Sequence, residues 1–321
     1  MTMWIATLPP IHRRELLEKI INHPMIGGVR YNSGYASGSN PEDTLITIIE
    51  LIRAAGKKLW IDLKGRQLRI DRWATPDYGK IVLNHEVEIY GQAFVLFRGE
   101  SDLSEIVKAN GRVIYVDPPP KYAVGQSQAI NVAGDIRIKG FLTNTDIAYV
   151  KAAVKLGNPY FMLSFVEQCS DWQQVKSLIM SSSGYSPEQE YELVLKIEST
   201  KGWDYASRSI NLGTLAKERL RLMAARDDLM INIGSTKSKI LKATQELINI
   251  DRSAIAASRL FANVEKDGKA SLGDFADLHL LYGMGYRHFM ISDGVCLHHF
   301  DEAIAAANDY YTEYPQHLTL E

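Results

Sequence analysis

The chain has 321 residues, 46% of them hydrophobic, so it is long enough to bury one large core or two ordinary ones. Its 36 basic and 38 acidic residues nearly cancel, without a long run of one sign, which argues against a nucleic-acid or polybasic membrane surface and favours a small-molecule partner. No stretch approaches the roughly eighteen apolar residues of a membrane span, and the amino terminus has no signal-peptide core. We therefore expect a cytoplasmic protein, with Cys169 and Cys296 as buried, reduced thiols.

Short apolar runs alternate with amphipathic segments along most of the chain, which is typical of βα units on a parallel sheet. The runs that we interpret as strands are residues 4–8, 25–30, 58–63, 160–165, 192–197, 222–226, 254–258 and 288–292. The helix after the second run has well-marked ends, because Asn40 is a good N-cap, Pro41 suits the first helical position and Gly56 ends the segment.

The segment from residue 70 to residue 138 interrupts this alternation. It contains short or alternating apolar runs broken by Gly, Asn and Pro, a pattern that suits a small antiparallel sheet. We expect an inserted β-rich cap domain at 70–138, after the third strand. The remaining parts, 1–69 and 139–321, carry eight βα units, which predicts an α/β fold of the (β/α)8 TIM-barrel class.

Active sites of such barrels lie at the carboxyl ends of the strands, and the residues that end the predicted strands here are unusually polar. They are Arg30, Asn32, Asp62, Lys64, Arg69, Lys196, Glu198, Arg226, Asp227, Asp228, Ser258 and Ser292. A single charge at a strand end commonly belongs to a solvated rim or a structural ion pair. A whole set on one rim needs further charge balance, and a divalent cation with an anionic substrate would supply it.

The chemistry of this set fits that interpretation. Mg²⁺ or Mn²⁺ takes oxygen ligands from one or two carboxylates, so Glu198 and Asp228, on adjacent strands, are sensible ligands. Lys196 and Arg30 then offer positive charge to a phosphoryl or enolate oxygen. Lys196 and Glu198 are two residues apart on one strand, and therefore point the same way.

Six short motifs also follow one another in the order found in a known family. They are "IATLPP", "GGVRYNSG", "IDLKGRQLR", "LSFVEQCSDW", "LKIESTKG" and "MAARDDLMINI". They resemble, in that order, the segments Thr-Ile-Gly-Pro, Arg-Leu-Asn-Phe-Ser-His-Gly, Asp-Thr-Lys-Gly-Pro-Glu-Ile-Arg, Ser-Phe-Val-Arg, Lys-Ile-Glu-Asn-X-X-Gly and Met-Val-Ala-Arg-Gly-Asp-Leu-Gly-Val-Glu-Ile. The chain thus resembles the catalytic barrel of pyruvate kinase, with a shortened cap and without that family's carboxyl-terminal regulatory domain.

The resemblance implies a role for each matching residue. Lys196 would stabilise the transferring phosphoryl group, Glu198 and Asp228 would hold the divalent metal, Arg30 would contact phosphate, and Ser258 would match an active-site threonine. It further implies Lys64, Arg69 and Asn32 near the nucleotide phosphates, Asn32 and Asp62 as ligands of a monovalent cation such as K⁺, and substrate contacts by Ser164, Asp227 and Ser292. Ala243 to Gln245 mimics the strand-seven motif of the family but lies in a helical segment, so register favours Ser258.

One departure from the family bears directly on substrate binding. Asp227 stands where the family has a glycine whose backbone approaches the carboxylate of the substrate. A second carboxylate there is expected to weaken binding of phosphoenolpyruvate or pyruvate unless Asp227 points away.

Three functions follow as hypotheses. The first is a metal-dependent transferase of pyruvate kinase type that acts on phosphoenolpyruvate and ADP. The second is a metal-dependent lyase or aldolase that acts on a 2-oxo acid at the same Glu198 and Asp228 site. The third is a non-catalytic homologue that binds a metabolite. The presence of Lys196, Arg69 and Lys64, together with a cap, favours the first hypothesis.

Overall fold

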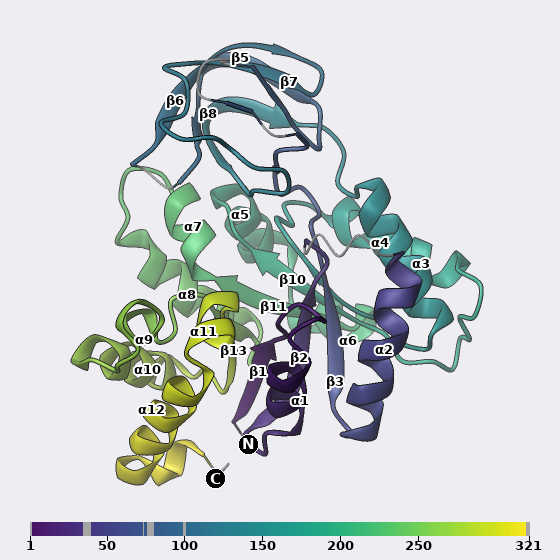
Figure 1. The fold of residues 1–321 in the computed structure, drawn as a ribbon, viewed down its shortest axis with the longest axis vertical. Helices are drawn as coiled ribbons and strands as arrows, with labels where there is room; N and C mark the ends of the chain where they lie inside the picture. The colour runs from purple at the N-terminus through teal and green to yellow at the C-terminus, as the bar shows by residue number, and fades with distance from the viewer. Residues whose placement is uncertain (1, 35–39, 73, 76–79, 99–100, 319–321) are drawn as a thin grey trace.

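The computed structural model describes residues 2–34, 40–72, 74–75, 80–98 and 101–318. In this part of the chain, eight parallel strands close into a barrel in the order β1-β13-β12-β11-β10-β9-β3-β2, as predicted (Figure 1). The barrel strands are β1 (Met3–Thr7), β2 (Ile26–Asn32), β3 (Lys58–Leu63), β9 (Tyr160–Leu163), β10 (Glu192–Ile197), β11 (Leu220–Ala225), β12 (Ile255–Ala257) and β13 (His288–Ile291).

The inside of the barrel is filled by alternate residues of these strands. Ile5, Trp60, Met162, Val194 and Met223 belong to one buried cluster there. Successive side chains of a strand point to opposite faces, so the residues between them, such as Leu193 and Leu195, pack outward against the helices. Both faces of each strand are therefore covered, which explains why the strands read as nearly continuous apolar runs.

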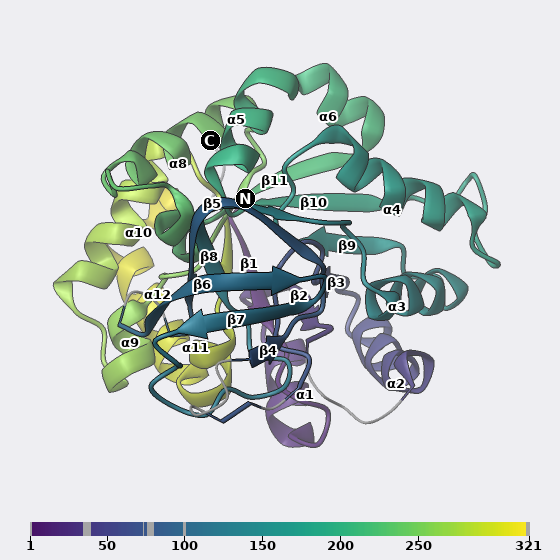
Figure 2. The ribbon, with the colours of Figure 1, turned by 90° about the horizontal axis from the view of Figure 1, so that it is seen from above.

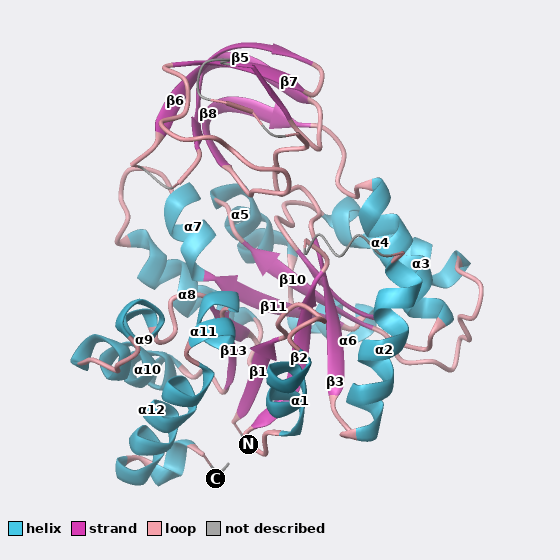
Figure 3. Ribbon diagram, viewed as in Figure 1, coloured by secondary structure: helices cyan, strands magenta, loops and turns pink. Residues whose placement is uncertain are grey.

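Helices surround the barrel on its outer side (Figure 3). They are α1 (Arg14–Asn22), α2 (Pro41–Ala54), α3 (Asn144–Lys155), α4 (Cys169–Ser181), α5 (Thr200–Ser209), α6 (Leu212–Glu218), α7 (Arg226–Asn232), α8 (Lys239–Ile250), α9 (Ala262–Asp267), α10 (Leu272–Met284), α11 (Asp293–His298), α12 (Phe300–Glu313) and the 3₁₀ turn η2 (Pro315–His317). Asn40 caps α2 as predicted, with its side chain accepting from the Glu42 amide, and Gly56 takes a positive φ of 64° beyond the helix end.

The segment between β3 and α3 forms a second, antiparallel sheet with the order β4-β7-β6-β5-β8. Its strands are β4 (Lys80–Val82), β5 (Val87–Leu96), β6 (Leu103–Asn110), β7 (Val113–Asp117) and β8 (Asn131–Ile138). The sheet has its own buried cluster, which includes Ile81, Val95 and Ile114. From above, its strands lie across one end of the barrel (Figure 2). We call this sheet the cap.

Several barrel strands end at a different residue than predicted, and for three of them the backbone shows why. β9 stops at Leu163 because Phe165 has a left-handed φ of 53°, and β12 stops at Ala257 because Ser258 has a φ of 64°. Arg226, predicted as the last residue of a strand, is instead the first residue of α7. Left-handed residues follow β9 and β12, and a helix follows β11 directly, and apolar periodicity reveals neither change.

Two further expectations can be compared with the structure. Cys296 is buried, but Cys169 is exposed, so the prediction of two buried thiols was wrong for Cys169, which begins α4 at the barrel rim. Among the described residues, no helix combines the length and the apolar character needed to cross a membrane.

Candidate active site

The carboxyl ends of the barrel strands face the cap (Figure 1). Several charged side chains at these ends are buried. Arg30 on β2, Asp62 on β3, Lys196 on β10 and Glu198 just beyond β10 are 8%, 4%, 7% and 1% exposed. Burial of a charge is costly unless the charge is paired and hydrogen-bonded. The partners of these groups therefore decide what the site can do.

Lys196 lies at the centre of the buried charges. Its Nζ donates to Ser164 Oγ at 2.8 Å, and lies 3.0 Å from Glu198 Oε1 and 3.4 Å from Asp62 Oδ1. Burial alone would lower the pKa of Lys196, but the adjacent carboxylates of Asp62 and Glu198 raise it above its ordinary value. Lys196 is therefore a fixed positive charge and a poor nucleophile.

Arg30 is held between two carboxylates. Its Nε donates to Asp62 Oδ2 at 2.7 Å, while Nη1 donates to Thr7 Oγ1 at 3.1 Å and pairs with Asp293. Burial would raise the pKa of Asp62, but Arg30 and Lys196 hold it below its usual range. The side chain of Asp293 is 39% exposed. Asp293 is thus the partner of Arg30 that an incoming anion could replace.

Glu198 and Asp228 are the predicted ligands of a divalent cation. Glu198 Oε2 accepts from the Phe165 amide at 2.6 Å, and burial raises the pKa of Glu198 to about 7, with Lys196 opposing and Asp228 adding to the rise. Burial also raises the pKa of Asp228, which Lys196 opposes. The negative charge of Asp228 is thus close enough to disfavour ionisation of Glu198.

Asn131 and Asp293 are site residues that the sequence interpretation missed. Asn131 is on cap strand β8 and donates from Nδ2 to Asp228 Oδ1 at 3.2 Å, so the cap touches a predicted metal ligand. Nothing in the sequence of the cap indicated this contact. Asp293 directly follows Ser292 at the end of β13, so a fuller reading of that strand end would have included it.

Asn32 and Asp62, the predicted monovalent-cation ligands, have partners within the protein. Asn32 donates from Nδ2 to Asp293 Oδ2 at 2.9 Å and accepts from the Gly34 amide at 2.9 Å. Asp62 already faces the two cations Arg30 and Lys196. The charge that a monovalent ion would bring is therefore supplied by side chains.

Ser258 lies in a strained turn. Its φ is 64° and that of Arg259 is 60°, and both are conformations that residues other than glycine rarely adopt. The turn is held by Arg226, which donates to the Ser258 carbonyl at 2.8 Å and forms a two-pronged pair with Asp277 at 2.6 and 2.8 Å. Ser292, by contrast, caps α11 and donates to Glu265 Oε2 at 2.8 Å.

Asp227 does not stand as an isolated charge. Its Oδ1 accepts from Arg259 Nε at 2.7 Å, and the side chains of Asp227 and Arg259 are 53% and 51% exposed. The repulsion expected between Asp227 and a substrate carboxylate is therefore partly compensated by Arg259.

Lys64 and Arg69 lie where β3 leads into the cap. The Arg69 guanidinium donates to the Ser127 carbonyl at 2.7 Å and to Gln67 Oε1 at 2.6 Å, so part of its hydrogen-bonding capacity is used within the protein. Burial lowers the pKa of both side chains, and Arg69 adds to the effect on Lys64. Two partly buried cations close together favour the binding of an anion between them.

The donor set fits a magnesium-type ion better than a zinc-type ion. Within the described residues, no group of three or more His, Cys, Asp and Glu side chains is placed to hold a metal. Zinc sites take three or four protein ligands, whereas Mg²⁺ is commonly held by one or two carboxylates and completed by water and substrate phosphate. Glu198 and Asp228, whose raised pKa values a cation would lower, match the second pattern.

Comparisons with known proteins can be set beside this geometry. No protein-family model matches the chain. Three curated pyruvate kinases are similar in sequence, those of Thermoplasma acidophilum, Methanocaldococcus jannaschii and Borreliella burgdorferi, at 23%, 26% and 22% identity over 72%, 72% and 87% of this chain. Two crystal structures of pyruvate kinase from Cryptosporidium parvum are similar in fold, with TM-scores of 0.67 and 0.69 over 92% and 98% of this chain, at 18% and 16% identity.

The chain is a pyruvate kinase-like barrel protein. It matches 42%, 50% and 60% of the length of the three curated relatives, so it spans about half of their length. It covers 64% and 72% of the two solved chains.

Proposed function

We propose that the protein is a divalent-metal-dependent phosphotransferase of pyruvate kinase type, which moves the phosphoryl group of an enol phosphate such as phosphoenolpyruvate to ADP. The observation that carries this proposal is the position of Lys196. Its ammonium group lies 3.0 Å from Glu198 and 3.4 Å from Asp62, buried at the carboxyl ends of the barrel strands. The kinship with pyruvate kinases supports the reaction class.

Lys196 would stabilise the charge of the phosphoryl group during transfer. Phosphoryl transfer depends mainly on positioning and on fixed positive charge, because the protein performs little covalent chemistry in it. A buried lysine that two carboxylates keep protonated meets that need. Arg30, oriented by Asp62, would add a phosphate contact by exchanging its exposed partner Asp293 for the substrate.

Glu198 and Asp228 would hold Mg²⁺ or Mn²⁺. When bound, such an ion supplies Lewis-acid stabilisation of the phosphoryl and enolate oxygens. Asn131 would orient the Asp228 carboxylate from the cap. Lys64 and Arg69 would meet the nucleotide phosphates, with Asn32 beside them, and Ser164, Ser258, Ser292 and Asp227 would border the substrate. Since Arg30 and Lys196 already neutralise Asp62, we do not propose a separate K⁺ site there.

The test is a coupled assay for pyruvate formation with phosphoenolpyruvate, ADP and Mg²⁺ or Mn²⁺, with and without K⁺. We expect turnover by the wild-type protein and a loss of roughly 10²-fold or more in kcat for Lys196→Met, the size typical of one lost electrostatic contact to a transition state. Lys58→Met is the matched control. Lys58 pairs at 2.7 Å with Glu192, and both residues begin their strands, at the end of the barrel opposite to the candidate site. Lys58→Met should keep its activity.

Measurements with other substrates and of metal binding separate the other two hypotheses. Metal-dependent consumption of a 2-oxo acid without ADP would replace the kinase by a lyase or aldolase. Metal binding without turnover of any of these substrates would contradict the phosphotransferase and leave a metabolite-binding homologue.

A further inference from the structure

A large cleft lies beside the candidate active site, between the cap and the rim of the barrel. Its volume is about 1790 Å³. Its walls come mainly from β8 and β5 of the cap on one side, and from the first half of α4, from α5 and from the end of α7 on the other. Lys196, Glu198 and Asp228 do not line it, but Ser199, the residue after Glu198, does. Phe165, whose amide donates to Glu198, and Asn232, which donates to the Glu198 carbonyl, also line the cleft, so the cleft adjoins the cluster around Lys196.

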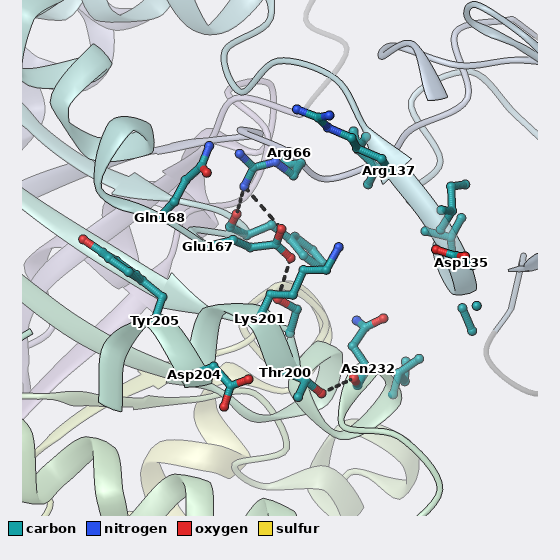
Figure 4. A pocket seen from close by; sticks show the side chains of 18 of the residues that line it. Arg66, Asp135, Arg137, Glu167, Gln168, Thr200, Lys201, Asp204, Tyr205 and Asn232 are labelled. Atoms are coloured by element: carbon teal, nitrogen blue, oxygen red, sulfur yellow. Dashed lines mark hydrogen bonds and ion pairs between the residues drawn. The ribbon is translucent and has the colours of Figure 1, made fainter. Parts of the chain in front are cut away.

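Several cationic side chains line this cleft, and three of them are labelled in Figure 4. Arg66 comes from the link between β3 and the cap, Arg137 from β8 and Lys201 from α5. Arg66 is 7% exposed and fully engaged, since it donates to Asp171 at 2.8 and 2.6 Å and to the Phe165 carbonyl at 3.0 Å. The Arg66 side chain is therefore held in place at the edge of the cleft by its hydrogen bonds.

Arg137 and Lys201 are different, because both are exposed and neither forms an ion pair with a carboxylate among the described residues. Glu88, the cross-strand neighbour of Arg137, pairs with Lys139 at 2.7 Å. Asp204, on the same helix as Lys201, lies 3.8 Å from Arg208. Two unpaired cations thus line opposite walls of one cleft.

The remaining wall groups suit the rest of a polar ligand. Asp135 shares a face of β8 with Arg137, since the two residues are two apart on a strand, and its carboxylate can accept from a hydroxyl group. Tyr205 of α5 presents its ring at the other end of the cleft (Figure 4). A ligand that is anionic at one end and carries hydroxyl groups elsewhere would complement these walls.

We propose that this cleft binds a small phosphorylated molecule, with its phosphate between Lys201 and Arg137. A phosphate carries nearly two negative charges, which matches two cations, and the guanidinium fork with a lysine point charge is a common way to hold it. Because Arg137 belongs to the cap and Lys201 to the barrel, the bound phosphate would tie the two together. The site would then act as an effector site that favours one position of the cap.

Binding is measured by calorimetry on the full chain, with inorganic pyrophosphate as the probe, in a metal-free buffer with 0.15 M NaCl that screens weak surface contacts. We expect Lys201→Gln and Arg137→Gln each to weaken one binding event by roughly tenfold or more, as for the loss of one charged hydrogen bond. Lys151→Gln, an exposed lysine on α3, is the matched control and should bind as the wild type does.

The Lys196→Met variant distinguishes this site from the candidate active site, and should keep the event that Lys201→Gln removes. Three results would each overturn the proposal. They are wild-type affinity in both Lys201→Gln and Arg137→Gln, no binding of pyrophosphate by the wild type, and loss of all binding in Lys196→Met alone. The result does not depend on turnover, so a failure of the phosphotransferase assay and a failure here are separate outcomes.

Discussion

Asn131 of the cap donates a hydrogen bond from Nδ2 to Asp228 Oδ1 at 3.2 Å, and so joins the inserted sheet to a predicted metal ligand of the barrel. The same side chain accepts from Asn232 Nδ2 at 3.0 Å. Asn232 in turn donates to the carbonyls of Glu198 at 3.2 Å and Asp228 at 2.8 Å. A small polar network therefore links the segments that carry Glu198 and Asp228 to the cap.

Removal of the Asn131 amide tests this link. Asn131→Ala takes a donor from the Asp228 carboxylate, and outer-shell partners of metal ligands typically contribute about tenfold or more to metal affinity. We expect Mn²⁺ binding, followed by electron paramagnetic resonance, to weaken by about that factor. Asn110→Ala, an exposed asparagine at the end of β6 in the same sheet, is the control. Equal affinity in the two variants would show that the cap does not orient Asp228.

Glu198→Gln tests the proposed metal site itself. The substitution keeps the shape of the side chain but removes the charge that a divalent cation needs, so Mn²⁺ affinity should fall by at least about tenfold. Glu192→Gln is the matched control, because Glu192 begins the same strand at the opposite end of the barrel. If Glu198→Gln bound Mn²⁺ as tightly as Glu192→Gln, the metal would have to be held elsewhere.

The Asp227 and Arg259 pair predicts opposite effects of two single substitutions. Arg259→Gln leaves the Asp227 carboxylate uncompensated at the rim, and should raise the KM for phosphoenolpyruvate several-fold. Asp227→Asn frees the Arg259 cation and should lower that KM or leave it unchanged. Exposed pairs contribute little to stability, at most about 1 kcal/mol, so both proteins should unfold near the wild-type temperature. Effects of the same sign would remove Asp227 from the substrate-binding surface.

His288 predicts a pH dependence of stability. It begins β13, its Nδ1 is buried without a hydrogen-bond partner among the described residues, and burial followed by the nearby Arg221 lowers its pKa to about 3. At pH values between about 3 and 6.5, His288 is protonated in the unfolded chain but neutral in the folded chain. The contribution of His288 is therefore complete above pH 6.5 and lost as the pH falls.

Denaturant unfolding of wild type and His288→Gln at pH 7 and pH 5 measures this effect. The loss of unfolding free energy between the two pH values should be smaller in His288→Gln than in the wild type. His12→Gln, at an exposed histidine, should show the wild-type loss. Identical losses in all three proteins would mean that His288 is not the group responsible.

Several features follow from the sequence because they depend on local physics. Alternation of apolar runs with amphipathic segments predicted the eight-stranded barrel, and the interruption of that alternation at residues 70–138 predicted the antiparallel insertion. The convergence of Arg30, Asp62, Lys196 and Glu198 followed from the rule that parallel strands end at one edge. A period of two was enough to place Lys196 and Glu198 side by side, and they lie 3.0 Å apart.

Only the tertiary structure decided which charges are paired. Arg259 reaches Asp227 from the next strand end, Asp293 completes the clamp on Arg30, and Asn131 arrives from a separate sheet. These contacts join residues distant in the chain, and they depend on how the cap lies over the barrel and on turns such as the one at Ser258. A pattern of hydrophobicity fixes which face a side chain occupies, but not the partner it meets, because that partner is set by the packing of separate elements in space.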